Sequence, residues 1–83
     1  MRKIKIEIIE FINNHKDKKE LVFSIAQLTN SSLQTVERWF KNNTKELLYY
    51  HVLVRIVYFY NKYNFTNFDI PQILQPNKKD NDN

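Results

Sequence analysis

Residues 24 to 43, SIAQLTNSSLQTVERWFKNN, limit the possible fold of this chain more than any other stretch. Ser24 and Gln27 have the spacing of a capping box, so the sequence predicts a helix that begins at Ser24. The inward side of that helix is formed by Ile25, Ala26 and Leu28. Residues 29 to 32, TNSS, then interrupt the apolar pattern with side chains that hydrogen-bond nearby backbone groups, which is typical of turns and caps. The stretch therefore predicts a short helix followed by a polar turn.

A second amphipathic helix follows this turn. Ser32 is placed to cap its first N–H groups. Val36, Trp39 and Phe40 recur at i, i+3 and i+4, so we expect these three side chains to be buried. Asn30 is the residue of the turn that best tolerates a positive φ. Outside the buried stripe lie Leu33, Gln34, Glu37, Arg38, Lys41 and Asn42.

The whole segment resembles the helix-turn-helix of lambda-repressor and Cro-like regulators. That family has an alanine, a glycine four residues later, a Val-Ser pair, a Thr-Val pair and a large apolar residue at fixed spacing. The corresponding residues here are Ala26, Asn30, Ser31-Ser32, Thr35-Val36 and Trp39. Asn30 takes the place of the glycine, and Ser31 takes the place of an apolar turn residue. The resemblance implies an all-α DNA-binding domain whose second motif helix enters the major groove.

A second resemblance covers the same residues. Val36, Trp39, Phe40 and Asn42 read V-x-x-W-F-x-N, which is similar to the recognition helix of a homeodomain. In that family the two aromatic residues are buried, the asparagine binds adenine, and arginines that contact phosphate follow. Here residues 43 to 45 are NTK, and a strongly apolar stretch that homeodomains lack comes next. The repressor-like interpretation is therefore preferred.

Residues before this segment predict a first helix and a polar connection. Residues 3 to 13 fit the period of a strand as well as that of a helix, and we choose a helix because of their length and their glutamates. Residues 14 to 20 contain no core residue and should form a connection. Phe23 is expected to act as a hydrophobic staple just before the Ser24 cap.

Residues 44 to 63 read as the longest helix and are apolar around most of its circumference. A small domain cannot bury such a helix on one side only, so either residues 65 to 75 fold over it or a second copy of the chain does. Residues 70 to 75 should form a short helix capped by Asp69, with Pro71 in its first turn. We expect a homodimer, with an interface that includes Tyr49, Leu53, Ile56 and Tyr60.

Composition limits the chain to one helical domain. It has 83 residues, of which 42% are hydrophobic, enough for one packed core but not for two. It contains no glycine, which strengthens a mostly helical interpretation because turns must use asparagine, serine, aspartate and lysine. The predicted fold has four main helices and a short C-terminal helix. The domain is expected at residues 1 to 75, followed by a disordered tail at residues 76 to 83.

The same composition limits the function classes. The net charge of +4 favours a polyanionic partner, although abundant lysine and asparagine also fit an AT-rich coding genome. The chain has no cysteine, which excludes disulfides and thiolate zinc sites and suits a cytosolic protein. Its longest apolar stretch, residues 47 to 60, contains His51 and Arg55 and is too short to cross a bilayer. We therefore expect a cytoplasmic, nucleoid-associated protein without a membrane partner.

Residues for catalysis or metal binding are sparse. His15 and His51 are the only histidines, and neither has a carboxylate or cysteine at ligand spacing, so no metal site is predicted. A glycine-rich phosphate loop is impossible without glycine. Caps and turns account for the serines of the motif. We expect no catalytic residue, no cofactor and no small-molecule ligand.

The sequence therefore predicts where duplex DNA would bind. Residues expected to contact base edges are Leu33, Gln34, Glu37 and Arg38, because they lie in the first turns of the second motif helix. Residues expected to contact phosphates are Gln27, Ser31, Ser32, Lys41, Asn42 and Lys45. The competing interpretation is a solvated helix face on which Glu37 and Lys41 form an i, i+4 ion pair.

The predicted function is a sequence-specific transcriptional regulator of the Cro or phage-repressor type, which acts as a dimer on double-stranded DNA. Two other classes remain open. One is a small protein-interaction module or inhibitor that uses the same fold, and the other is a DNA-recombination accessory protein. Loss of DNA affinity at higher salt would separate the first alternative from the prediction.

Overall fold

The described part of the chain forms five α-helices and one short 3-10 helix, so the fold is all-α. The structure is a computed structural model and describes residues 2–76. The elements are α1 (Ile6–Asn13), α2 (Lys18–Thr29), α3 (Leu33–Asn42), η1 (Lys45–Leu48), α4 (Tyr50–Asn64) and α5 (Ile70–Ile73). The prediction of four main helices and a short C-terminal one is confirmed.

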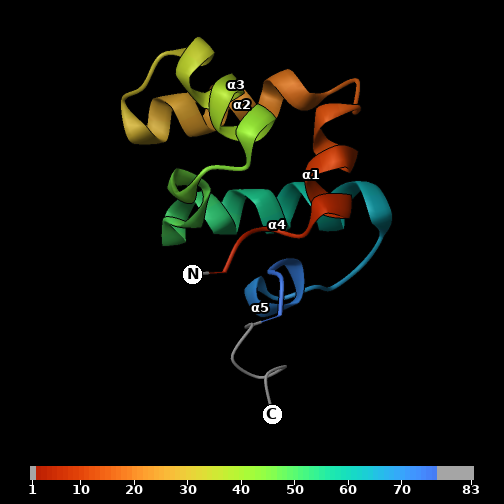
Figure 1. The fold of residues 1–83 in the computed structure, drawn as a ribbon. Helices are drawn as coiled ribbons and strands as arrows, with labels where there is room; N and C mark the ends of the chain where they lie inside the picture. Colours follow the sequence, from red (N-terminus) through yellow and green to blue (C-terminus); the bar gives the residue numbers. More distant parts are fainter. Residues whose placement is uncertain (1, 77–83) are drawn as a thin grey trace.

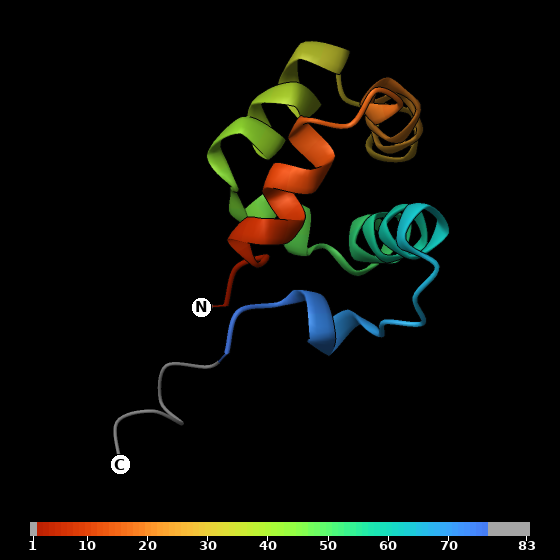
Figure 2. The same ribbon diagram turned by 90° about the vertical axis from the view of Figure 1, so that its right-hand side faces the viewer.

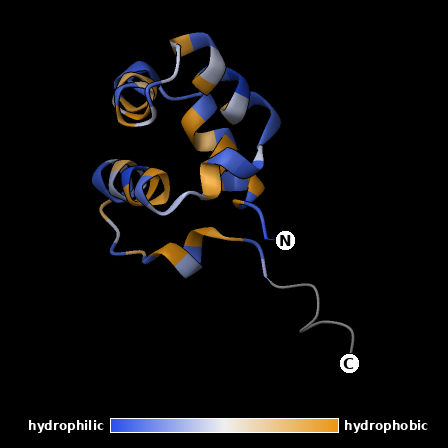
Figure 3. Cartoon of the chain, turned by 90° about the vertical axis from the view of Figure 1, so that its left-hand side faces the viewer, coloured by the Kyte–Doolittle hydropathy of each residue, from blue (hydrophilic) through white to orange (hydrophobic). Residues whose placement is uncertain are grey.

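Two pairs of helices cross each other. Figure 2 shows α2 and α4 nearly end-on, whereas α1 and α3 run across the view beside each other. α3 contacts α2, α1 and η1, and α4 contacts α2, η1 and α5. The C-terminal segment passes below α4 (Figure 1). Hydrophobic and hydrophilic residues alternate along the helices (Figure 3), as expected for amphipathic helices around one core.

The apolar stripe of α3 lies in that core, as predicted. Val36 and Phe40 are fully buried, and Trp39 is almost so. These side chains belong to one cluster with residues of the other elements, including Ile8, Ile12, Ile25, Leu47 and Ile56. Because the stripe is buried, the opposite side of α3 faces solvent.

The start of α2 differs from the prediction. The helix begins at Lys18 rather than at Ser24, because the buried Leu21 and Val22 extend the apolar side of Ile25 toward the N-terminus. Ser24 is therefore inside the helix, where its Oγ accepts a hydrogen bond from Arg55 Nη1 at 3.0 Å. Two predictions that depended on the Ser24 start are wrong, since Phe23 is not a staple and Leu28 does not face inward. Both side chains are exposed.

The two ends of the described chain are joined to each other. Residues 3 to 5 are extended rather than helical, contrary to the prediction for that segment. The Lys5 N–H donates to the Ile73 carbonyl at 2.8 Å. The Gln75 N–H donates to the Lys3 carbonyl at 2.7 Å. The strand period of the first residues therefore has a structural counterpart in this short antiparallel pairing.

The predicted long helix from residue 44 to 63 is broken at Tyr49. This residue has an extended ψ of 135°, so the four residues of η1 are separated from α4. Leu47 of η1 is fully buried against the core. The break therefore lets η1 and α4 bury apolar residues in different directions, which one straight helix cannot do.

The predicted dimer interface on α4 requires a correction. Leu53 is 6% exposed and Ile56 is fully buried, because both side chains pack in the core of their own chain. Neither is accessible to a second copy while the domain is folded. Tyr49 is exposed, and Tyr60 is half-buried with its ring stacked on Phe68 at a centroid distance of 5.4 Å.

The C-terminal segment folds over α4, the first of the two arrangements that the sequence left open. Asn61 holds it in place, because its Nδ2 donates to the Phe68 carbonyl at 3.0 Å and its Oδ1 accepts from the Phe68 N–H at 2.9 Å. At the start of α5 the Asp69 N–H donates to Gln72 Oε1 at 2.7 Å, which is half of the capping box found there. Pro71 lies in the first turn, as predicted. The predicted tail at residues 76 to 83 lies outside the described residues except for Pro76.

Across residues 2–76, no helix combines the length and the apolar character needed to span a membrane.

Candidate nucleic-acid interface

The turn between α2 and α3 is set by local residues. Asn30 has a φ of 55°, in the left-handed region predicted for it. The Ser31 N–H donates to the Ala26 carbonyl at 2.9 Å and so closes the end of α2. Ser32 caps α3, as predicted, because its Oγ accepts from the Thr35 N–H at 3.1 Å. This turn directs the first residues of α3 away from the core.

The residues predicted to contact bases lie on the solvent side of α3. Leu33, Gln34 and Arg38 are exposed, and Glu37 is half-buried. Gln34, Arg38 and Lys41 follow one another at i, i+4 and i+7, so they lie along one line of the helix surface. The geometry therefore brings an amide, a guanidinium and an ammonium group to one ridge.

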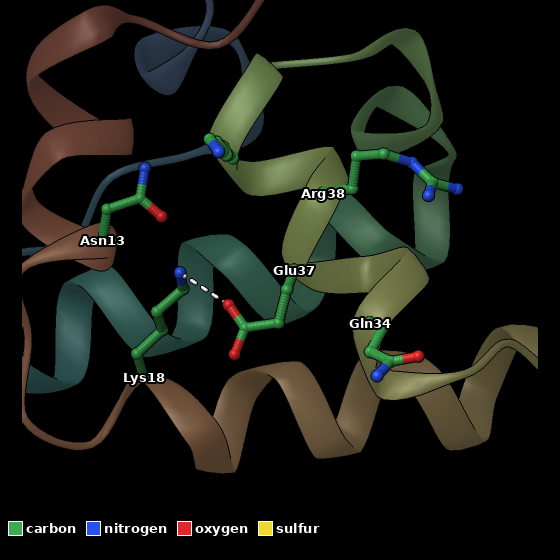
Figure 4. Close-up of a pocket in the computed structure, with 6 residues that line it drawn as sticks. Asn13, Lys18, Gln34, Glu37 and Arg38 are labelled. Atoms are coloured by element: carbon green, nitrogen blue, oxygen red, sulfur yellow. Dashed lines mark ion pairs between the residues drawn. The ribbon is translucent and has the colours of Figure 1, made fainter.

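A hollow of about 630 Å³ runs beside this ridge. Its lining comes from three helices and consists of Asn13, Lys18, Gln34, Glu37, Arg38 and Lys41. Figure 4 shows Asn13 on α1 and Lys18 on α2 facing the side chains of α3 across this space. Asn13 also fixes the end of α1 to α3, because its Nδ2 donates to the Phe40 carbonyl at 3.2 Å.

Glu37 forms an ion pair across the hollow with Lys18 rather than along its own helix with Lys41. The Nζ of Lys18 lies 2.7 Å from Glu37 Oε1, as the dashed line in Figure 4 indicates. The pairing suggested by the sequence, between Glu37 and Lys41, is therefore wrong. Lys18 offsets the negative charge of Glu37, which leaves the ridge with the net positive charge of Arg38 and Lys41.

A polar corner holds the start of α2, where Lys18 lies. The Asp17 N–H donates to His15 Nδ1 at 3.0 Å, and the Tyr63 hydroxyl of α4 donates to Asp17 Oδ2 at 2.9 Å. This hydrogen bond to the carboxylate raises the pKa of Tyr63, because it stabilises the protonated phenol. The ring of His15 lies 4.2 Å from that of Tyr63, centroid to centroid. The corner thus links α1, α2 and α4 immediately before Lys18.

The residues predicted to contact phosphates are more widely spread over the surface than the residues predicted to contact bases. Gln27, Asn42 and Lys45 are exposed on three different elements and do not line the hollow, whereas Lys41 does. The hydroxyls of Ser31 and Ser32 already have partners within the turn. Ser31 Oγ accepts from Thr29 Oγ1 at 2.9 Å, and Ser32 Oγ donates to Thr35 Oγ1 at 2.8 Å.

Asn13 and Lys18 are the two residues of the hollow that sequence reasoning missed. The signal for Lys18 was the basic run at residues 16 to 20, KDKKE, which was interpreted as a polar connection. Asn13 carried no comparable signal, because only the packing of α1 against α3 brings it to this place.

Among residues 2–76, no three histidine, aspartate or glutamate side chains gather as ligands for a metal ion. Comparison of the chain with known protein families, with curated proteins and with solved structures finds no match.

Proposed function

We propose that this protein is a sequence-specific regulator that binds double-stranded DNA with α3 in the major groove. The observation that carries the proposal is the orientation of α3. Its apolar stripe is buried, while Gln34, Arg38 and Lys41 form an exposed ridge that is continuous with the capped N-terminal turn. A helix of this kind fits the width of the major groove and presents its first turns to the base edges.

The chemistry of the ridge suits base and phosphate contacts. The Gln34 amide can pair bidentately with adenine, and the Arg38 guanidinium can pair bidentately with guanine. Lys41, one turn further along α3, is placed to contact phosphate as a point charge. Glu37 Oε1 is paired with Lys18 Nζ at 2.7 Å, so its second carboxylate oxygen is the one placed to accept a hydrogen bond from cytosine N4.

The proposed mode of action is steric repression by a dimer, in which an occupied operator excludes polymerase. Two-fold related copies would place their α3 helices about 34 Å apart, one turn of DNA. Because Leu53 and Ile56 are buried, such a dimer must use the exposed residues of α4. The large apolar and aromatic ones are Tyr49 just before the helix and Tyr50, Val54 and Tyr58 on it. Sedimentation of the protein with and without Tyr58→Asp tests this arrangement.

The salt dependence of binding tests the proposal most directly. Affinity for random duplex DNA is measured at about 50 and about 200 mM salt by fluorescence anisotropy, and about four phosphate contacts predict a loss of roughly 150-fold. Lys41→Ala should reduce the slope by about one counterion. An affinity that does not change with salt would reject DNA as the ligand.

Arg38 separates base recognition from phosphate contact. If Arg38 binds a guanine, Arg38→Ala weakens binding to the selected operator by about 1 to 3 kcal/mol and leaves binding to random duplex nearly unchanged. Lys41→Ala is the matched control, since it should weaken both equally. An equal loss on both DNAs for Arg38→Ala would assign that side chain to the backbone instead.

A protein-interaction module is the second candidate. The observation in its favour is the pair of exposed tyrosines on α4, Tyr50 and Tyr58, because tyrosine is enriched where proteins meet. Loss of function in Tyr58→Ala with DNA affinity unchanged would support it. A recombination accessory protein would bind DNA as well, and a DNA-bending assay distinguishes that function from repression.

A further inference from the structure

A second hollow lies between α2 and α3, and most of its lining surface is apolar. It encloses about 550 Å³ and is lined by Lys19, Glu20, Val22, Phe23, Leu33, Gln34 and Glu37. Phe23 is 55% exposed and Leu33 is 50% exposed, although both are large apolar side chains. Their exposed surface therefore has no partner within residues 2–76.

This apolar hollow is continuous with the hollow beside the ridge. Gln34 and Glu37 line both spaces, so one surface extends from Phe23 on α2 across the first turn of α3 to Arg38. Phe23 and Leu33 therefore belong to the same surface as Gln34 and Arg38. The apolar pair thus lies beside the proposed base contacts.

The charges around the two hollows favour a polyanion over a basic protein segment. Four cationic side chains line them, namely Lys18, Lys19, Arg38 and Lys41, against the carboxylates of Glu20 and Glu37. One of the two acids is offset, because Glu37 is paired with Lys18 at 2.7 Å. Apolar side chains beside basic ones match one feature of the major groove, in which the C5-methyl groups of thymines lie between two rows of phosphates.

We propose that Phe23 and Leu33 together form a subsite for thymine methyl groups, so that Phe23 on α2 takes part in base recognition alongside α3. This inference rests on the proposed function. The DNA site that it predicts is a half-site in which thymines lie next to the base pairs contacted by Gln34 and Arg38. Thymine is the only standard base with an apolar group in the major groove. Gln34 beside the subsite suits adenine, so A·T pairs would be selected at adjacent steps.

The experiment compares thymine with uracil in DNA. Binding sites are selected in parallel from two random duplex pools, one made with thymidine and the other with deoxyuridine, which lacks only the methyl group. The best thymidine site is then synthesised with single thymine-to-uracil replacements. Removal of a methyl in contact with Phe23 or Leu33 should weaken binding about fourfold, whereas other replacements should have no effect.

Variants assign the effect to residues. In Phe23→Ala the penalty for at least one thymine-to-uracil replacement should disappear, because the side chain that contacts the methyl is gone. Leu33→Ala should remove the penalty at a neighbouring position. Phe65→Ala and Leu28→Ala are matched controls, since Phe65 is 95% exposed and Leu28 is exposed on α2, and neither lines the two hollows. Circular dichroism verifies that each variant is folded.

The outcomes distinguish this inference from the function on which it rests. Equal affinity for the thymidine and uracil sites, with selection of a defined sequence, would overturn the methyl subsite and leave the DNA-binding proposal intact. Failure of both pools to yield a salt-dependent ligand would overturn the DNA-binding proposal itself. A uracil penalty that Phe23→Ala leaves unchanged would remove Phe23 from the base contacts.

Discussion

The two ends of α3 are held in opposite ways. At the C-terminal end Phe40 is fully buried, and Asn43, which has a φ of 51°, donates from its Nδ2 to the Ile4 carbonyl at 2.9 Å inside the protein. At the N-terminal end the capping hydrogen bond from the Thr35 N–H to Ser32 Oγ is exposed, and Leu33 projects into solvent.

This difference suits a helix that enters a groove. The first turns must be accessible, yet the helix must not tilt, because a small misplacement weakens every base contact at once. The buried end supplies the rigidity, and the exposed end supplies the contacts. Substitutions at the two ends should therefore affect different quantities, stability at one end and recognition at the other.

The largest expected difference comes from truncating one apolar side chain at each end. Phe40→Ala removes a fully buried ring and should lower the free energy of unfolding by about 3 to 5 kcal/mol. Leu33→Ala removes a half-exposed side chain and should change it by less than about 0.5 kcal/mol. Urea unfolding followed by circular dichroism measures both. Similar losses for the two variants would show that the N-terminal end is anchored as well.

The two left-handed asparagines give the next largest effect. Asn43→Gly keeps the backbone conformation but removes the donor to the Ile4 carbonyl, so it should cost about 1 to 3 kcal/mol. Asn30→Gly should change the unfolding free energy by only about a few tenths of a kcal/mol, because that side chain is exposed and glycine adopts the same φ. Thermal unfolding compares the two. A larger loss for Asn30→Gly would contradict the assigned roles.

The Ser32 cap is expected to contribute about 1 kcal/mol. Ser32→Ala should lose that amount because the Thr35 N–H then has no side-chain acceptor, and Ser32→Asp should restore it because aspartate caps equally well. The negative charge added in Ser32→Asp should nevertheless lower DNA affinity below that of the unmodified protein, because it repels phosphate. If Ser32→Asp recovers DNA affinity together with stability, the capped turn does not face phosphates.

The ion pair between Lys18 and Glu37 should contribute least to stability. Glu37→Gln is expected to lower the unfolding free energy by about 0.2 to 1 kcal/mol, since both side chains are partly exposed, and the loss should shrink in high salt. Glu10→Gln, at an exposed position of α1, is the matched control. A salt-independent loss above that range would show that the pair is shielded from solvent.

Features that depend on neighbouring residues were predictable from the sequence. The burial of Val36, Trp39 and Phe40, the φ of Asn30 and the Ser32 cap all follow from helical spacing and turn chemistry within about ten residues. The exposure of Leu33, Gln34 and Arg38 followed from the same pattern, because a buried stripe fixes the opposite face.

Features that depend on distant residues were not predictable. The start of α2 at Lys18 depends on burial of Leu21 and Val22 in the shared core, which outweighs the local capping signal at Ser24. The helix is interrupted at Tyr49 because one apolar run is buried in two directions, which periodicity alone does not reveal. The pairing of Lys18 with Glu37 joins two helices whose relative placement no local rule specifies.

The antiparallel bridge between Ile4 and Leu74 makes the order of synthesis relevant to this domain. Arg2 and Gln75, which are hydrogen-bonded at 2.8 Å, are separated by 73 residues, so at about 5 to 20 residues per second the first segment waits roughly 4 to 15 seconds for its partner on the ribosome. Until then Lys3 and Lys5, on either side of Ile4, lack their backbone hydrogen bonds to Gln75 and Ile73. The Ile4 carbonyl accepts from Asn43 at the anchored end of α3, and it gains its second donor, Gln75 Nε2 at 3.4 Å, only when the C-terminal segment has emerged.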